Sequence, residues 1–288
     1  MFGEVPGRVD RRAAEAVGRR WSRANALLSV TWAWCAAELV VSLVALAWTV
    51  LSGPELPLVG SPKRGDLVGL AFVALIVLLP MPLASWAGRR DADGIDWRLK
   101  PDGWLMYGFI VGIAQALGLF LSITYTALPL WVRIGVGIIG AAVPVVAALL
   151  ARRAILAEPL REIGGSEFVL VKGLRSPQGG GEDSVKITGD SMRLSVRTAA
   201  GRPAGQAAAK DIRLADITEI GVRPARPDDG AWAPLADGRG ASLPEGDVVV
   251  IRTRTDTQLL PADTELAELL RARAALHGAE PARIEDWT

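Results

Sequence analysis

The side chains that most often carry out catalysis are scarce in this sequence. Its 288 residues include one histidine, His277, and one cysteine, Cys35. A Ser-His-Asp triad would have to use His277, and Cys35 sits inside an apolar run, where no Cys/His metal cluster is available. We therefore expect no catalytic residue, no metal site and no cofactor, and the chain is predicted not to be an enzyme.

Two loops have a superficial similarity to ligand-binding motifs. The glycine run at 179–181 is followed by Glu182 and Asp183, not by the Lys-Ser/Thr and helix of a phosphate-binding loop. The aspartates of 91–96 lack the spacing of a calcium loop, since Gly94 comes two positions early and Ile95 takes a ligand position. The first loop is predicted to be a hairpin tip and the second a polar turn.

Two polar residues within apolar runs are the remaining candidates for chemistry. Glu38 and Gln115 reach a similar depth of about 17 Å, counted from one side of the membrane at about 1.5 Å per residue. An acid at that depth is costly and is a functional candidate by default. We expect a structural clamp, with protonated Glu38 bonded to Gln115 or to a backbone carbonyl. A proton or substrate path is the alternative.

Small residues spaced four apart mark a helix-packing face. They are Gly108, Gly112 and Ala116 in one apolar run, and Gly137 and Ala141 in the next. This spacing puts them on one side of a helix and lets two backbones approach closely. The sequence predicts packing between helices of this chain, with a homodimer as the alternative.

These residues belong to an apolar block at 27–156. Four stretches of about 20 residues or more can each cross a hydrocarbon core of about 30 Å. These predicted transmembrane helices lie at 27–51, 67–87, 104–123 and 130–150. Tryptophans near the span ends, where indole prefers to lie, agree with the boundaries: Trp21, Trp86, Trp104 and Trp131.

The basic residues outside the spans predict the orientation. The leader at 1–26 holds six arginines, the three connections hold two, four and no Lys or Arg, and three arginines follow the last span. Because positive charge is retained on the cytoplasmic side, both termini are predicted to be cytoplasmic. The leader is expected to be a solvated tail or a short interfacial helix. Usage rich in Ala, Arg, Gly and Pro is typical of a bacterium, so the expected location is a bacterial plasma membrane.

The pattern changes from helical spacing to alternation after residue 164. Short strands are predicted at 167–174, 184–187, 192–198, 210–214, 217–222, 247–253 and 258–260. A helix capped by Asp263 and stopped by Gly278 follows, and a tail covers 278–288. The predicted fold class is an α+β membrane protein, with a four-helix transmembrane bundle before a small antiparallel β-barrel or sandwich that a C-terminal helix caps.

Three segments in the second half carry a resemblance to a known family. They are SVKITGDSMRLSV at 184–196, IRLADITEIGVRP at 212–224 and DVVVIRTRTDTQLLPADTELAELLRAR at 247–273. Their order resembles the hairpin, central strand pair and final strand-plus-helix of bacterial pleckstrin-homology-like (PH-like) domains, over 165–277. The resemblance implies a binding module without enzymatic activity. The first hairpin loop lacks the dense Lys/Arg of phosphoinositide-binding relatives.

Two functions follow as hypotheses. The favoured one is a non-enzymatic integral membrane protein that presents a cytoplasmic PH-like binding or scaffolding module to a protein or peptide partner. The alternative is a small transporter, or a transporter subunit, that uses Glu38 and Gln115 at the bilayer midplane. The net charge of +1 gives no general attraction to nucleic acid, so the lipid bilayer and a protein are the expected partners.

Overall fold

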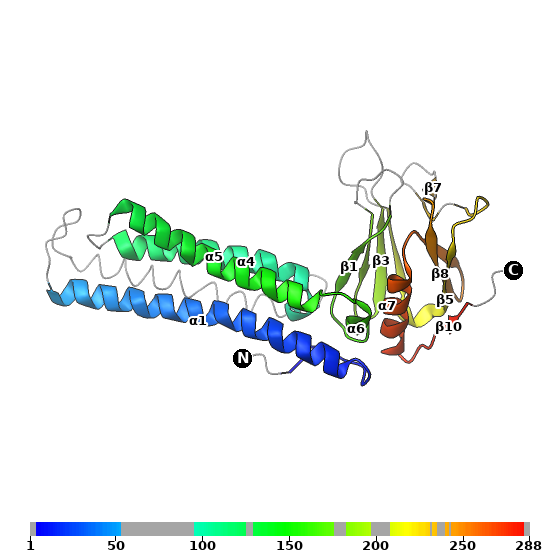
Figure 1. The fold of residues 1–288 in the computed structure, drawn as a ribbon, viewed down its shortest axis with the longest axis horizontal. Helices are drawn as coiled ribbons and strands as arrows, with labels where there is room; N and C mark the ends of the chain where they lie inside the picture. The colour runs from blue at the N-terminus through cyan, green and yellow to red at the C-terminus, as the bar shows by residue number, and fades with distance from the viewer. Residues whose placement is uncertain are drawn as a thin grey trace. The chain divides into compact units, whose positions relative to one another are not determined.

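A computed structural model describes residues 4–52, 95–124, 129–175, 183–196, 208–230, 232–234, 240–241 and 243–284. The chain divides into two compact units. Unit 1 is formed by Arg20–Ile155 together with the first four residues, and unit 2 by Val5–Arg19 and Leu156–Thr288. Figure 1 shows helices in the first unit and a β-sheet domain in the second.

Three helices in the described part of the chain are long and apolar enough to cross a membrane. They are α1 (Ala14–Ser52), α4 (Pro101–Thr124) and α5 (Leu130–Ile155). The prediction of four such helices is thus reduced to three, since the span expected at 67–87 lies outside the described residues. Helix α1 also begins well before the apolar run, because residues 14–26 contain no proline that would end or kink a helix.

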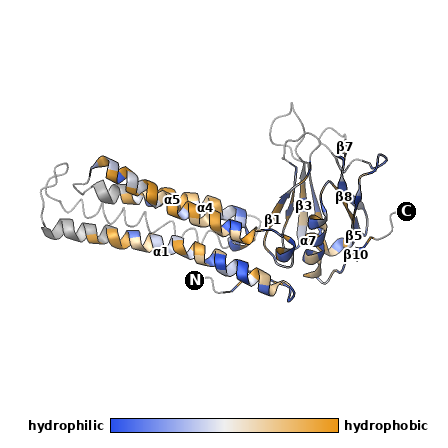
Figure 2. Cartoon of the chain, viewed as in Figure 1, coloured by the Kyte–Doolittle hydropathy of each residue, from blue (hydrophilic) through white to orange (hydrophobic). Residues whose placement is uncertain are grey.

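The surface of unit 1 carries the large aliphatic side chains. Ile113 on α4 is 67% exposed and Ile138 on α5 is 63% exposed, whereas Glu38 and Gln115 are buried. Figure 2 shows the apolar colour running along α4 and α5. A water-soluble protein has the opposite arrangement, so these helices are those of a multi-pass membrane protein.

Aromatic and charged contacts hold one end of unit 1. The rings of Trp21 and Trp104 are 6.2 Å apart between centroids, and both are buried. Trp131, at the start of α5, is exposed. Arg152 pairs with Asp102 at 2.7 Å and so joins α5 to the first turn of α4.

Two four-stranded sheets form unit 2. The first has the order β1-β2-β3-β4 and consists of Leu170–Gly173, Ser184–Ile187, Ser191–Val196 and Ala208–Arg213, all antiparallel. The second has the order β10-β5-β8-β9 and consists of Ala282–Arg283, Ile217–Pro224, Asp247–Thr253 and Thr257–Leu260. In this sheet β10 runs parallel to its neighbour β5. A third, two-stranded sheet pairs β6 (Ala233–Pro234) with β7 (Gly240–Ala241).

The seven predicted strands are observed as β1 to β5, β8 and β9, most of them with shifted bounds. Of the predicted barrel or sandwich, the described residues form open sheets and no closed barrel. Among the described residues no backbone ladder joins the two four-stranded sheets. The chain leaves β4 through a 3-10 turn, η2 (Leu214–Asp216), before it enters β5. Strand β5 therefore belongs to the second sheet, and β4 is the last strand of the first. Strand β9 is in turn the last strand of the second sheet, so both β4 and β9 are edge strands.

Helix α7 (Thr264–Ala275) contributes one side of the core of unit 2 and lies beside the sheets in Figure 1. Its buried face contains Leu266, Leu269 and Leu270. The predicted cap is confirmed, because the Asp263 side chain accepts a hydrogen bond from the amide of Leu266. Gly278 has a φ of 70°, a left-handed conformation that favours glycine just beyond a helix.

A buried arginine ties α7 to three other segments. Arg273 is 0% exposed and donates to the carbonyls of Gly164, Phe168 and Thr188 at 2.9, 2.7 and 2.7 Å. Gly164 ends the short helix α6 (Arg161–Gly164). Burial lowers the pKa of Arg273 to about 9, and the nearby Glu167 opposes that change. The guanidinium therefore keeps its charge at neutral pH.

The N-terminal segment belongs to unit 2 and differs from the solvated tail or interfacial helix expected for the leader. Val9 forms an antiparallel bridge with Ser166, and the amide of Asp10 donates to the carbonyl of Gly165 at 2.8 Å. A Cβ on Gly165 would lie 2.8 Å from that of Ala13, so only glycine allows this close approach. The contact is non-local, and hydropathy alone could not reveal it.

Candidate functional site

An open groove of about 390 Å³ lies between the two sheets of unit 2. One wall comes from β4 and η2, and the other comes from β9 and the turn before it. Its lining residues are Lys210, Asp211, Ile212, Arg213, Asp216, Thr253, Arg254, Thr255, Asp256 and Gln258. The volume falls within the range of about 300–1,000 Å³ that is common for ligand sites.

The groove exists because two edge strands meet without pairing. Strand β4 is the last of its sheet, and β9 is the last of the other. An edge strand offers alternate backbone N–H and C=O groups that have no neighbour in the sheet. The two walls therefore present backbone hydrogen-bonding groups as well as side chains.

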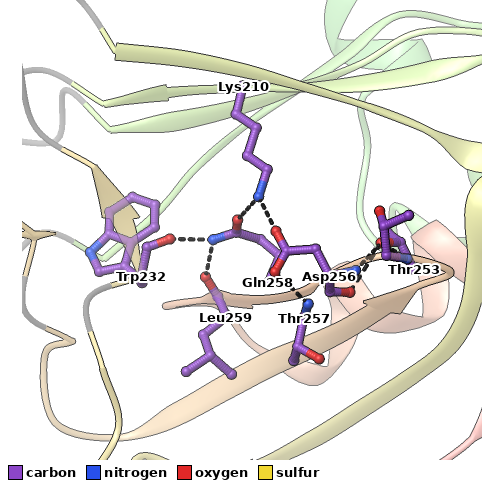
Figure 3. A network of polar contacts seen from close by, with 8 residues as sticks. Lys210, Trp232, Thr253, Asp256, Thr257, Gln258 and Leu259 are labelled. Carbon is purple, nitrogen blue, oxygen red and sulfur yellow. Dashed lines mark hydrogen bonds and ion pairs between the residues drawn. The ribbon is translucent and has the colours of Figure 1, made fainter.

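Side chains bridge the groove where a backbone ladder is absent. Figure 3 shows Lys210 of β4 extending toward Asp256 and Gln258. Its Nζ donates to a carboxylate oxygen of Asp256 at 2.6 Å and to Oε1 of Gln258 at 3.0 Å. Gln258 is buried, and its amide donates in turn to the carbonyls of Leu259, at 3.1 Å, and of Trp232.

Hydrogen bonds within the β8–β9 turn position the acidic partner of Lys210. Thr253 Oγ1 accepts from the amide of Asp256 at 3.0 Å and donates to its carbonyl at 3.0 Å. The amide of Thr257 donates to the Asp256 carboxylate at 2.7 Å. The bond from Lys210, followed by the bond from Thr257, lowers the pKa of Asp256, so this side chain is ionised at neutral pH.

Two arginines give one end of the groove a positive charge. Arg213 is the last residue of β4 and Arg254 follows β8, and both are exposed. Neither makes an ion pair with another described residue. By contrast, the neighbouring Arg252 pairs with Glu219 at 2.7 Å. The amide of Arg254 donates to the carbonyl of Asp216 at 3.2 Å, which fixes the turn against η2.

Some charged side chains of the groove are paired with each other or with neighbours among the described residues, and others are not. Asp256 is occupied by Lys210, and Asp211 lies 3.7 Å from Arg193. Two positive side chains and one negative side chain, Asp216, then remain without a charged partner among the described residues. Three or more His, Cys, Asp or Glu side chains do not gather into a metal-binding group anywhere in 4–52, 95–124 or the other described ranges.

The predicted polar residues of the membrane block both lie in the interior of unit 1. Glu38 is 5% exposed and Gln115 is buried. A Cβ on Gly140 would lie 3.1 Å from a carboxylate oxygen of Glu38 and 3.8 Å from the amide of Ala116. Helices α1, α4 and α5 thus meet at this carboxyl group.

The predicted small residues lie where α4 meets α5. A Cβ on Gly108 would come within 2.8 Å of the Ala148 side chain, and one on Gly112 within 2.6 Å of the Ala141 carbonyl. On α5, Gly137 lies opposite the carbonyl of Ala116, at 3.6 Å from an added Cβ. These small residues therefore allow α4 and α5 to pack closely within the chain.

His277 and Asp96, two further residues considered from the sequence, make hydrogen bonds within the fold. His277, expected at the surface, hydrogen-bonds through Nε2 to the carbonyl of Gly189. Asp96 accepts from the amide of Arg98 at 2.9 Å and caps a 3-10 turn, η1 (Trp97–Leu99), as a polar turn predicts. Asp91, Asp93 and the glycine run at 179–181 lie outside the described residues.

Sequence reasoning missed the pairing of Lys210 with Asp256 and Gln258. These residues are separated by 46 and 48 positions, so no local pattern connects them. One weak signal was present, since Gln258 occupies an inward position of an alternating strand where an apolar residue is usual. A buried amide in such a position requires hydrogen-bonding partners.

No protein-family model matches the chain, and no curated protein is similar enough to count as a match.

Proposed function

We propose that the chain is a non-enzymatic protein of a bacterial plasma membrane that presents a cytoplasmic binding or scaffolding module. The observation that carries the proposal is the groove between β4 and β9. It combines two unpaired strand edges with arginines that have no ion-pair partner among the described residues. Such a surface can accept an added strand, because an edge strand has backbone groups without a neighbour in its sheet.

The order of elements supports a PH-like module. Four antiparallel strands form one sheet, three more form the next, and helix α7 follows them in sequence and packs against β5 and β8. This order is the one that the resemblance of 165–277 implies. The added strand β10 and the docked segment at 5–19 are features beyond that resemblance.

The charge of the connections supports cytoplasmic termini. Six arginines at 1–26 precede the apolar part of α1, and three more lie in the last turn of α5 and shortly after it, whereas the connection at 124–129 has no basic residue. Positive residues stay on the cytoplasmic side during insertion. Unit 2 follows α5 directly and would then face the cytoplasm.

A site-specific photo-crosslinking experiment tests the binding role. A photoreactive amino acid replaces Thr255 at the groove in the full chain in its native membranes, and a matched variant carries it at Thr218, which is exposed on β5 away from the groove. The expected result is a discrete adduct from position 255 that excess unmodified protein competes away. Equal adduct patterns from both positions, or no competition, would refute a binding role for the groove.

A second function is favoured by one specific observation, the buried carboxyl of Glu38 at the junction of three helices. A buried intramembrane acid is a candidate for proton or substrate passage. A transporter predicts that Glu38→Gln abolishes uptake of a substrate or protons into vesicles while the protein remains folded. A structural role predicts unchanged uptake and a stability change of about 1 kcal/mol.

A further inference from the structure

The lining of the groove includes two guanidinium groups that form no ion pair among the described residues. Arg213 and Arg254 come from different sheets and line the same groove, yet neither has an ion-pair partner among the described residues. Two other basic residues at or beside the groove do form ion pairs, Arg252 with Glu219 and Lys210 with Asp256. Two guanidinium groups left open beside a groove form a site for carboxylate groups.

We propose that the groove binds an extended, acidic segment of a protein partner, which adds to the β4 edge and places its carboxylates at Arg213 and Arg254. This inference rests on the proposed binding function and names the class of ligand. The segment's backbone would meet the unpaired edge of β4, as in other cases of strand addition. Its side chains on one face, two residues apart, would alternate along the groove.

The distribution of charge along β4 sets the pattern of the partner. Lys210 already has Asp256 and Gln258 as partners and so contributes little free charge. Arg213 lies three residues further along the strand, at the end of β4. The acidic residues of the bound segment are therefore expected at the η2 end of the groove, with uncharged residues beside Lys210.

The same charges disfavour an anionic membrane surface as the ligand. The groove also contains Asp211, Asp216 and Asp256, so its lining carries three acidic residues beside three basic ones. Residues 165–288 hold 16 Lys and Arg against 19 Asp and Glu, a net charge of −3. A flat anionic surface would meet these acids as well as the arginines, whereas a narrow segment can avoid them.

Binding of defined peptides to the full chain in nanodiscs of zwitterionic lipid tests the inference. The probe is a fluorescent peptide, Glu-Val-Glu-Val-Thr-Val, and its matched control has lysine in place of glutamate. Fluorescence anisotropy should show saturable binding of the acidic probe and at least tenfold weaker binding of the lysine probe. Hydrogen exchange should show added protection of residues 208–213 only with the acidic probe.

Substitutions identify the site. Arg213→Glu together with Arg254→Glu should weaken the acidic probe at least tenfold and restore binding of the lysine probe. Arg252→Glu, one residue from the turn but outside the groove, should change the affinity less than twofold, because its ion pair is exposed. Unchanged hydrogen exchange of both variants without peptide would show that they remain folded.

Several outcomes would overturn the inference. These are equal binding of the two probes, an equal loss with Arg252→Glu, and groove-dependent binding of anionic vesicles in place of the peptide. If the acidic probe fails while competed crosslinks still form at position 255, the ligand class is wrong and the binding role stands. If both fail, the proposed function is wrong as well.

Discussion

The two compact units differ in where their large apolar side chains lie: many are exposed in unit 1, and most are buried in unit 2. In unit 1, exposed positions include Met106, Phe109 and Ile113, while glycines, Glu38 and Gln115 lie inside. In unit 2, Val171 is the one large aliphatic side chain that is half exposed among the described residues, and Val248 to Ile251 are fully or almost fully buried. The difference indicates two solvents, because each unit turns toward its surroundings the groups that those surroundings favour.

The units also use polar groups differently. Unit 2 surrounds a buried charge with hydrogen bonds, as Arg273 shows with its three carbonyl partners. Unit 1 relies on close backbone approach, as Gly112 shows against Ala141. Where apolar side chains gain nothing by leaving lipid, tight packing of small residues must hold the helices together. Substitutions at these two residues should thus act on one unit each.

The largest effect is expected from Arg273→Met. The change leaves the carbonyls of Gly164, Phe168 and Thr188 buried without this donor, and each such group costs about 1–3 kcal/mol. Unit 2 should lose at least about 3 kcal/mol of unfolding free energy, as measured by pulse proteolysis in urea. The exposed Arg193→Met is the control and should change stability by less than about 0.5 kcal/mol. Equal effects would contradict the account.

A smaller effect, confined to unit 1, is expected from Gly112→Val. The new side chain would meet the backbone carbonyl of Ala141, which cannot move without separating α4 from α5. Overpacking of this kind costs about 1–3 kcal/mol. Thermal aggregation of the detergent-solubilised protein should begin at a lower temperature. Gly135→Ala on the same helix pair is the control, since an added Cβ there meets nothing within 4 Å.

The smallest effect concerns the pH dependence of unit 2. The bond from Lys172 lowers the pKa of Glu265, and despite the opposing effect of burial, bonds to Asp263 and Glu265 raise the pKa of Lys172. A lowered carboxyl pKa gives stability that is present above the unfolded value, about 4.3, and lost as pH falls through the folded pKa. Lys172→Met should therefore cost about 1 kcal/mol at pH 7 and less at pH 3.

Urea unfolding of both proteins at the two pH values measures this difference. An unchanged cost at pH 3 would show that Lys172 acts through packing of its aliphatic stem. Unit 1 is the internal control, because these three residues all belong to unit 2.

Local patterns were sufficient for many elements of both units, but not for the short strands β6, β7 and β10. Apolar runs predicted α4 and α5, and alternation predicted strands such as β2 and β8 with their observed bounds. The cap at Asp263 and the stop at Gly278 follow from backbone chemistry that is local to the helix end. Hydropathy could not set the start of α1, since the helix continues beyond its apolar part.

The groove and the docked leader depend on contacts between distant residues. Lys210 meets Asp256 across the two sheets, and Val9 bridges to Ser166. No pattern within a short window contains such pairs. Arg273 is different, because its spacing from Leu269 and Leu270 places it on the buried face of α7. An arginine at this position of the helix therefore indicates, from the sequence alone, a buried side chain that needs hydrogen-bond acceptors.

Cysteine labelling tests the contrast between the two units most directly. The chain has one cysteine, so Cys35→Ala provides a cysteine-free background for Thr255→Cys in unit 2 and Ile113→Cys on the exposed face of α4. A membrane-impermeant maleimide should label position 255 only after spheroplasts are lysed, and should not label position 113 in either sample. Rapid labelling of position 113 after lysis would show that these apolar helices face water, and labelling of position 255 in intact spheroplasts would place the groove outside the cytoplasm.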